Sequence, residues 1–407
     1  MNFDDIANIP AALCVRCKGN KLLCGKNSCP IVTKYYASAN LILDTRSISG
    51  SSPPSIFVGS FGYPKVRIGP AVPPVTGNTE IFERPDKWVG LKIEEISRMR
   101  FSLYRGYKLI PVKEAVSPGN YLSEVHDLLL SSRPVESSML YSSPEKKLDI
   151  SPETQPFGPG GYIRSFDHES SSSNSTIERM YYDTDIKASE SVLFLYDSTS
   201  LYIIEKMLSA GMLGKEKGRR IVPTRWAITA TDTIISNGIF SELKGAETVE
   251  ANLFYHYRNI GNEYYILISP GPYSFEVIES WNNGSIWTGA RGSSTEGDYE
   301  DWKRFVREPK IGGSFFAAKL VILDHLKRKG KIGRIIVTRF IDGEYTIPLG
   351  VWQVRENIRK ALQDEVVLED FEKYFSIVKE RKALDVRQFS RTYRIIKNQT
   401  KLTEYGI

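Results

Sequence analysis

The spacing of apolar residues predicts a mixture of helices and strands, with no fixed-period repeat. Six segments carry apolar residues at intervals of three and four, as amphipathic helices do. They are residues 88–104, 121–130, 200–212, 314–329, 351–362 and 368–382. Three apolar, aromatic runs at 251–257, 263–269 and 273–279 are separated by Gly- and Pro-containing turns and predict an antiparallel meander. The short run at 191–196 predicts a buried strand.

These elements predict an α+β fold with mixed or antiparallel sheets, flanking helices and a small N-terminal cysteine motif. A chain of 407 residues is long for a single core, so two subdomains are expected. We divide it into a four-cysteine motif, a core part with Gly/Pro-rich loops, an irregular Ser- and Pro-rich insertion or linker, an α+β core and a basic tail. The corresponding ranges are 1–35, 36–130, 131–189, 190–385 and 386–407.

Composition narrows the class of protein only moderately. Hydrophobic residues at 41% and charged residues at 25% are typical of a soluble globular protein. No apolar run reaches the ~18 residues that a membrane span needs, so no membrane association is expected. The 54 basic and 48 acidic residues give a net charge of only +6, so only local clusters of cations would indicate a nucleic-acid partner.

All four cysteines lie in the first thirty residues, at Cys14, Cys17, Cys24 and Cys29. The first two form a CxxC pair, a spacing that lets one turn direct both thiolates at one ion. Four thiolates satisfy the tetrahedral preference of zinc and leave no open position for a substrate, so we expect one structural zinc ion. An iron–sulfur cluster is the alternative. Disulfides are disfavoured, because the N-terminus lacks the features of a secretory signal and a reducing cytosol is expected.

Residues 52–70 alternate short apolar runs with Gly and Pro. In the run that contains Lys65 and Arg67, the two cations share one face of the expected strand. This pattern is consistent with a cradle for a nucleotide or phosphate, or with a hairpin that has tight turns. It matches neither the GxGxxG nor the P-loop motif.

Residues 218–232 are dense in groups that bind phosphates and stack on bases. They contain Arg219, Arg220, Arg225 and Trp226. The alternative is a basic loop that leads into a helix whose tryptophan belongs to the core. Together with Lys65 and Arg67, these residues are the candidate nucleic-acid or nucleotide site.

Three aspartates are weak candidates for a catalytic metal site, namely Asp183, Asp185 and Asp232. Two-metal phosphoryl chemistry needs several convergent acids and would use magnesium. The sequence contains no dense acidic motif, and turn or cap roles are commoner for such aspartates.

The C-terminal residues form a separate signal. Gln399 is followed by an aliphatic residue three positions on, Leu402, and by an aromatic residue three further on, Tyr405. This spacing places both apolar residues on one face of a helical turn that would fill an apolar groove of a partner.

The combination of these motifs resembles the archaeal Nre DNA repair proteins over essentially the whole chain. The matching pieces are the four cysteines with Pro30, the Ser52-Pro53-Pro54-Ser55 run with the following Gly59 and Gly62-Tyr63-Pro64, residues 219–232, and the tail. The resemblance implies a role in DNA damage repair, a cytoplasmic, nucleoid-associated location, and binding to the sliding clamp PCNA through Gln399, Leu402 and Tyr405. A single tyrosine followed by Gly406 departs from the usual pair of aromatics, so we expect weak clamp binding.

Three functions follow from these observations. The first is a zinc-containing repair factor that binds single-stranded DNA, DNA ends or nucleotides and is recruited to the clamp. The second is a metal-dependent nuclease that uses Asp232 with other carboxylates. The third is a scaffold that binds the clamp without contacting DNA.

Overall fold

The computed structural model describes residues 8–19, 21–26, 29, 31, 46–145, 154–170 and 172–398. The chain divides into two units, and each is discontinuous in sequence. The first unit comprises residues 1–31, 239–347 and 354–407, and the second comprises 32–238 and 348–353. Among the described residues, no helix combines the length and the apolar character that crossing a membrane requires.

The second unit is built on a six-stranded sheet with the order β1-β5-β6-β4-β3-β2. The pairs are antiparallel except for β4 and β6, which are parallel. The strands are β1 (Ser47–Ser52), β2 (Ile56–Val58), β3 (Lys65–Val72), β4 (Tyr104–Pro111), β5 (Val135–Glu145) and β6 (Gly160–His168). The helices are α4 (Ile93–Phe101), α5 (Asn120–Leu130), α6 (Ser175–Tyr182), α7 (Ala188–Tyr196), α8 (Leu201–Ser209) and α9 (Thr224–Glu242), which continues into the first unit.

The first unit contains a mixed six-stranded sheet with the order β11-β10-β13-β9-β8-β14 and a two-stranded β12-β7 pair. The strands are β7 (Glu247–Thr248), β8 (Asn252–Asn259), β9 (Asn262–Ser269), β10 (Ser274–Trp281), β11 (Ser294–Asp301), β12 (Lys331–Ile332), β13 (Arg334–Ile341) and β14 (Val366–Leu368). The helices are α2 (Ala11–Cys17), α10 (Gly313–Lys329), α11 (Trp352–Ala361), α12 (Phe371–Lys382) and α13 (Arg391–Asn398). The expected α+β class with mixed sheets is confirmed.

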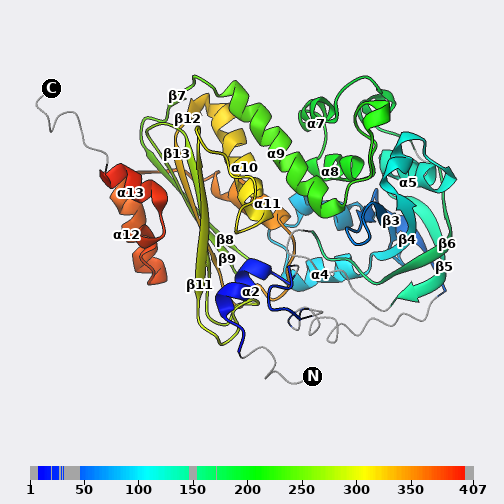
Figure 1. Ribbon diagram of the computed structural model, residues 1–407, viewed down its shortest axis with the longest axis horizontal. Helices are drawn as coiled ribbons and strands as arrows, with labels where there is room; N and C mark the ends of the chain where they lie inside the picture. The colour runs from blue at the N-terminus through cyan, green and yellow to red at the C-terminus, as the bar shows by residue number, and fades with distance from the viewer. Residues whose placement is uncertain are drawn as a thin grey trace, which may run out of the picture. The chain divides into compact units, whose positions relative to one another are not determined.

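Helices cover both faces of the sheet in the first unit, with α10 on one side and α12 on the other (Figure 1). Strands β9 and β10 are therefore buried along their whole length, which explains why their apolar and aromatic residues do not alternate strictly with polar ones. The carboxylates on these strands, such as Glu276 and Glu279, are buried as well. On the α10 face, the rings of Phe275 and Phe315 are 5.1 Å apart.

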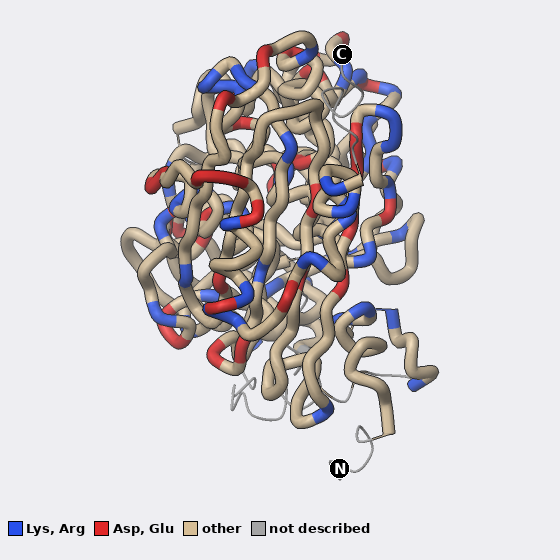
Figure 2. Tube along the Cα trace, turned by 90° about the vertical axis from the view of Figure 1, so that its left-hand side faces the viewer, with Lys and Arg blue, Asp and Glu red and all other residues tan. Residues whose placement is uncertain are grey.

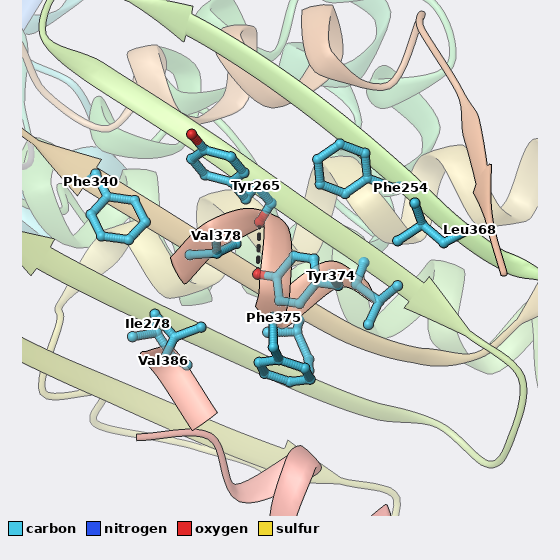
Figure 3. Packing of buried hydrophobic residues seen from close by; sticks show 11 residues of the cluster. Phe254, Tyr265, Ile278, Phe340, Leu368, Tyr374, Phe375, Val378 and Val386 are labelled. Atoms are coloured by element: carbon cyan, nitrogen blue, oxygen red, sulfur yellow. Dashed lines mark hydrogen bonds between the residues drawn. The ribbon is translucent and has the colours of Figure 1, made fainter. Parts of the chain in front are cut away.

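On the α12 face, aromatic residues of the helix pack on the strands (Figure 3). Tyr374 and Phe375 are fully buried against Phe254 and Tyr265. The Tyr374 hydroxyl is 3.3 Å from the carbonyl of Tyr265 and 2.6 Å from the hydroxyl of Thr338. The phenol is thus satisfied inside the core, as a buried hydroxyl must be.

Three expectations about secondary structure are wrong. Residues 191–196 lie in α7, where Val192 and Leu195 are buried while Leu193 and Phe194 are exposed, a helical spacing that overrides the strand propensity. The expected meander is interrupted, because β13 inserts between β9 and β10. The segment expected to be irregular instead contributes β5, β6 and α6.

The Ser52–Pro53–Pro54–Ser55 run is held by a buried carboxylate rather than exposed as a loop. The Ser55 hydroxyl donates to Glu83 at 2.6 Å. Glu83 also pairs with Arg100 of α4 at 2.5 Å and with Lys206 of α8 at 2.6 Å, and Lys206 donates to the Pro54 carbonyl. Burial alone would raise the pKa of Glu83, but the charges of Arg100 and Lys206 lower it from its usual 4.5 to about 2.

We expect Glu83→Gln to lower the free energy of unfolding by about 3–5 kcal/mol at pH 7, because it leaves two buried cations without a counter-charge. The pKa of Glu83 is lower in the folded state than in the unfolded state. Its contribution to the free energy of unfolding is therefore complete above pH 4.5 and is lost as the pH falls towards 2. Urea unfolding of both proteins across this range measures the effect. Glu80→Gln, which removes a partly exposed ion pair with Arg84, is the control and should change stability by less than about 1 kcal/mol. Equal stability of Glu83→Gln and wild type at pH 7 would contradict the assignment.

Candidate functional site

The end of β2 and the start of α9 are joined by a hydrogen bond, although 166 residues separate the bonded pair. The backbone N–H of Val58 donates to the Thr224 hydroxyl at 2.8 Å. Thr224 also lies 3.3 Å from the hydroxyl of Ser209, and all three residues are buried. The structure therefore brings together the segments 52–70 and 218–232, which the sequence suggests as two walls of one site.

Three exposed aromatic side chains belong to these joined segments. Phe61, Tyr63 and Trp226 are 87%, 51% and 43% exposed. The rings of Tyr63 and Trp226 are 5.3 Å apart and inclined by 52°. We call these three residues the aromatic surface. Because exposed aromatic rings offer π-faces for stacking, this surface is suited to hold planar, unpaired bases.

A tight turn presents Phe61 and Tyr63. Gly62 between them has a φ of +86°, a conformation that glycine adopts without strain. Its carbonyl accepts the backbone N–H of Lys65 at 3.0 Å, which closes the turn. Neither Phe61 nor Tyr63 is among the site residues predicted from the sequence. The pattern that could have indicated them is the Phe-Gly-Tyr-Pro turn followed by two cations.

Several of the predicted cations lie near the aromatic surface in the sequence. Lys65 is exposed at the start of β3, and Arg225 is partly exposed immediately before Trp226. Arg67 is half-buried, with its guanidinium 5.0 and 5.1 Å from the ring centroids of Tyr107 and Tyr162. Lys65 and Arg225 are thus the cations of this set best placed to meet phosphates.

Arg219 has a structural role instead. Its side chain is buried and donates to the backbone carbonyls of Gly214, Tyr181 and Asp183 at 2.6–3.0 Å. The neighbouring Arg220 is partly exposed, and its guanidinium donates to the Lys217 carbonyl at 3.0 Å. Only the second of these two arginines is accessible to a ligand.

The three candidate aspartates do not form a metal site. Asp232 is fully buried in α9. Asp183 accepts the backbone N–H groups of Asp185 and Ile186 at 3.1 and 3.2 Å, which is a turn role, and Asp185 is exposed. Among the described residues, no three His, Cys, Asp or Glu side chains are grouped closely enough to hold a metal ion.

The four cysteines line one small pocket in the first unit, and none forms a disulfide. Cys14 and Cys17 lie three residues apart on α2, which places them on the same side of the helix. Apolar side chains complete the pocket, namely Ile9, Leu13, Leu22, Ile31 and Trp287. The donor chemistry and the shared pocket fit a thiolate-bound ion, whereas the sulfur atoms are not placed as a coordination sphere.

Two cations tie this cysteine motif to the rest of the first unit. Arg291 donates to the Cys14 sulfur at 3.4 Å and to the Ile9 carbonyl. Lys18, the residue after Cys17, pairs with Glu279 of β10 at 3.1 Å. Burial alone would raise the pKa of Glu279, but Lys18 and the neighbouring Arg339 lower it to about 2.

The expected clamp-binding residues Gln399, Leu402 and Tyr405 lie outside the described residues. The structure does describe α13, the helix that precedes them. The buried carboxylate of Glu276 on β10 accepts hydrogen bonds from the Ser390 hydroxyl and from the backbone N–H groups of Arg391 and Thr392, at 2.5–3.0 Å. It therefore caps the N-terminus of α13 and anchors this helix to the sheet.

Basic and acidic residues are interspersed along the trace (Figure 2). Any affinity for nucleic acid must therefore come from local groups such as Lys65 and Arg225, and not from the mild net charge of +6.

The fold and the cysteine-lined pocket define an α+β protein with an N-terminal cysteine motif. Comparison with known families identifies its family. The N-terminal model of the archaeal Nre family matches residues 23–288, and the C-terminal model of the same family matches residues 300–405. The chain belongs to the archaeal Nre family.

Relatives in two archaea support this assignment. DNA repair protein NreA of Archaeoglobus fulgidus is 34% identical over 362 residues, which cover 88% of this chain and 91% of the relative. DNA repair protein NreB of the same organism is 33% identical, with 85% and 87% covered. DNA repair protein NreA of Haloferax volcanii is 33% identical, with 79% of each chain covered. No solved structure matches the chain.

Proposed function

We propose that this protein is a DNA repair factor that holds single-stranded DNA on the aromatic surface of its second unit. The relatives named as DNA repair proteins support the repair role. The observation that carries the DNA-binding part is the pairing of Tyr63 with Trp226, 5.3 Å apart and both exposed, beside the cations Lys65 and Arg225. Aromatic rings stack on bases of any sequence, while cations contact the phosphates.

The nuclease alternative receives no support from the described residues. Asp232 is buried, Asp183 is occupied with backbone N–H groups, and the three candidate carboxylates do not converge. Magnesium-dependent phosphoryl transfer requires such convergence. A binding role is therefore preferred to a catalytic one.

We further propose that the cysteines hold one structural zinc ion. Four thiols around one apolar pocket, without a disulfide, supply the donor set of a closed zinc site. Arg291, which donates to the Cys14 sulfur, would stabilise the thiolate form. The ion would hold the motif together and take no part in chemistry.

We also propose that the C-terminal tail recruits the protein to the sliding clamp PCNA. The support is the spacing of Gln399, Leu402 and Tyr405, together with the anchored helix α13 directly before them. A clamp that binds the tail would bring the DNA-binding surface to sites of DNA synthesis and repair.

We expect Trp226→Ala to weaken binding of a fluorescein-labelled 20-mer of oligothymidylate by about 1–3 kcal/mol, because the variant has no indole ring on which a base can stack. Arg225→Ala should reduce the slope of log K against log[salt] by about 0.7 for each phosphate that the arginine neutralises in the wild type. Fluorescence anisotropy across a salt series measures both. Arg98→Ala, at an exposed arginine of α4, is the control. If Trp226→Ala, Arg225→Ala and the control all bind like wild type, the aromatic surface does not bind DNA; clamp binding without any DNA binding would identify a scaffold.

Elemental analysis should find about one zinc per chain. Cys14→Ser should lose the metal and lower the melting temperature, because three thiolates cannot complete the tetrahedron and metal binding is coupled to folding. Arg16 is exposed between the first two cysteines, and Arg16→Ala should keep the metal and the wild-type melting temperature. Iron in place of zinc, with a brown protein, would identify a cluster instead.

Deletion of residues 399–407 should abolish binding to the clamp and leave the melting temperature unchanged, because α13 remains capped by Glu276. Each buried anchor is worth roughly 1.5–3 kcal/mol, less the ordering of the peptide, so micromolar affinity is expected. Tyr405→Ala should reproduce most of the loss, while Thr403→Ala should have little effect. Calorimetry of the clamp with each protein is the measurement, and binding that survives the deletion would place the clamp site elsewhere.

A further inference from the structure

A short turn in the first unit carries an exposed aromatic ring among cations that form no ion pair within the described part of the chain. Trp302, in the turn after β11, is 59% exposed. Four cations occur within nine residues of this turn, and all four are exposed: Lys303, Arg304, Arg307 and Lys310. One carboxylate, Glu308, is exposed beside them. We call residues 302–310 the basic turn.

We propose that the basic turn is a second contact site for single-stranded nucleic acid, with Trp302 stacking on a base and the flanking cations contacting phosphates. This site lies in the other unit from the aromatic surface and does not rest on it. It would stand even if the aromatic surface bound nothing.

The turn is held in shape before any ligand arrives. The Asp301 carboxylate accepts the backbone N–H groups of Lys303 and Arg304 at 2.9 and 3.0 Å, and backbone hydrogen bonds between Asp301 and Arg304 close the turn in both directions. The second Asp301 oxygen accepts the Tyr299 hydroxyl at 3.2 Å. The Asp301 carboxylate, which is the nearest to Trp302 in sequence, is thus hydrogen-bonded within the turn. It repels an incoming phosphate less than a carboxylate exposed to solvent would.

The base of the turn is fixed to buried groups. Glu300 is fully buried, pairs with Lys319 at 2.7 Å and accepts the backbone N–H of Val306 at 3.1 Å. Phe305 packs on Phe240 with ring centroids 5.5 Å apart. Phe305 is thus packed on one side although it is 43% exposed, and Trp302, at 59%, is the more exposed ring for a ligand.

The four cations of the basic turn do not serve to hold the fold. None of them forms an ion pair within the part of the chain that the structure describes, and the Lys303 ammonium lies 5.0 Å from the centroid of the Trp302 ring. Cations that stabilise a fold are normally paired or hydrogen-bonded, whereas phosphate-binding cations are exposed. A basic surface with an exposed tryptophan ring fits a strand of phosphates and stacked bases. It fits a membrane less well, because a membrane anchor needs a cluster of apolar residues, whereas this turn exposes two rings among four cations and one of these rings, Phe305, packs on Phe240.

The test uses the full chain and a fluorescein-labelled 20-mer of oligothymidylate, followed by anisotropy over a salt series. Trp302→Ala should raise Kd by about 5- to 150-fold, and Trp302→Phe, which keeps an aromatic face, should recover most of this loss. Lys303→Ala should lower the salt slope by about 0.7. The matched control is Lys373→Ala, at an exposed lysine of α12 in the same unit.

Thermal melting of each variant shows whether the protein still folds, and the salt slope of Lys303→Ala serves as the readout if Trp302→Ala does not fold. Repeating the series in a Trp226→Ala background removes the contribution of the aromatic surface. Weaker binding by Trp302→Ala together with no effect of Trp226→Ala would support the basic turn and reject the aromatic surface. Kd and salt slope of Trp302→Ala and Lys303→Ala that equal those of Lys373→Ala would overturn the proposal. So would variants that lose binding to phosphatidylserine vesicles while oligothymidylate binding is unchanged.

Discussion

A desolvated carboxylate between two cations holds distant segments together in each unit of this protein. Glu83 does so in the second unit and Glu279 in the first, and each has its pKa lowered to about 2 by its two partners. Burying three charges is expensive, and the arrangement is stable only when every partner is present. Ser55, which is bonded to Glu83, directly precedes β2, the strand that leads to the aromatic surface, and the cysteine motif is attached through Lys18 to Glu279. Both candidate sites therefore depend on the same kind of interaction.

The sequence predicts local structure where periodicity is strong and fails where pairing is long-range. The helix expected at residues 314–329 is α10, displaced by one residue at its start, because its apolar spacing is set by its own residues. The insertion of β13 between β9 and β10 depends on a parallel pair that closes only after α10 has crossed, and no local pattern encodes it. In α7, apolar residues such as Leu193 face solvent, so a run that reads as a buried strand forms a helix with only one buried face.

In the candidate site too, some features can be predicted from the sequence and others only from the folded chain. The sequence singles out two segments in which glycines, prolines and arginines gather, and the Val58–Thr224 hydrogen bond shows that the fold joins them. It does not separate the arginine that serves the fold from the one that meets solvent, since Arg219 and Arg220 are adjacent and chemically identical. Burial decides between them, through three backbone carbonyls that only the folded chain brings to Arg219. The exposure of Phe61 is equally invisible in sequence, because phenylalanine is among the residues most often buried.

The capping of α13 by Glu276 has a geometric consequence for recruitment. Glu276 fixes the start of this helix to the sheet, and the helix ends at Asn398, so seven residues lead from its end to Tyr405. Such a segment spans at most about 25 Å when fully extended. A clamp bound at Tyr405, as proposed, would therefore stay within about 25 Å of the end of α13 and could move little relative to the first unit. The basic turn belongs to that same unit, so a clamp bound by the proposed contact would stay at a high effective concentration near the unit that carries Trp302.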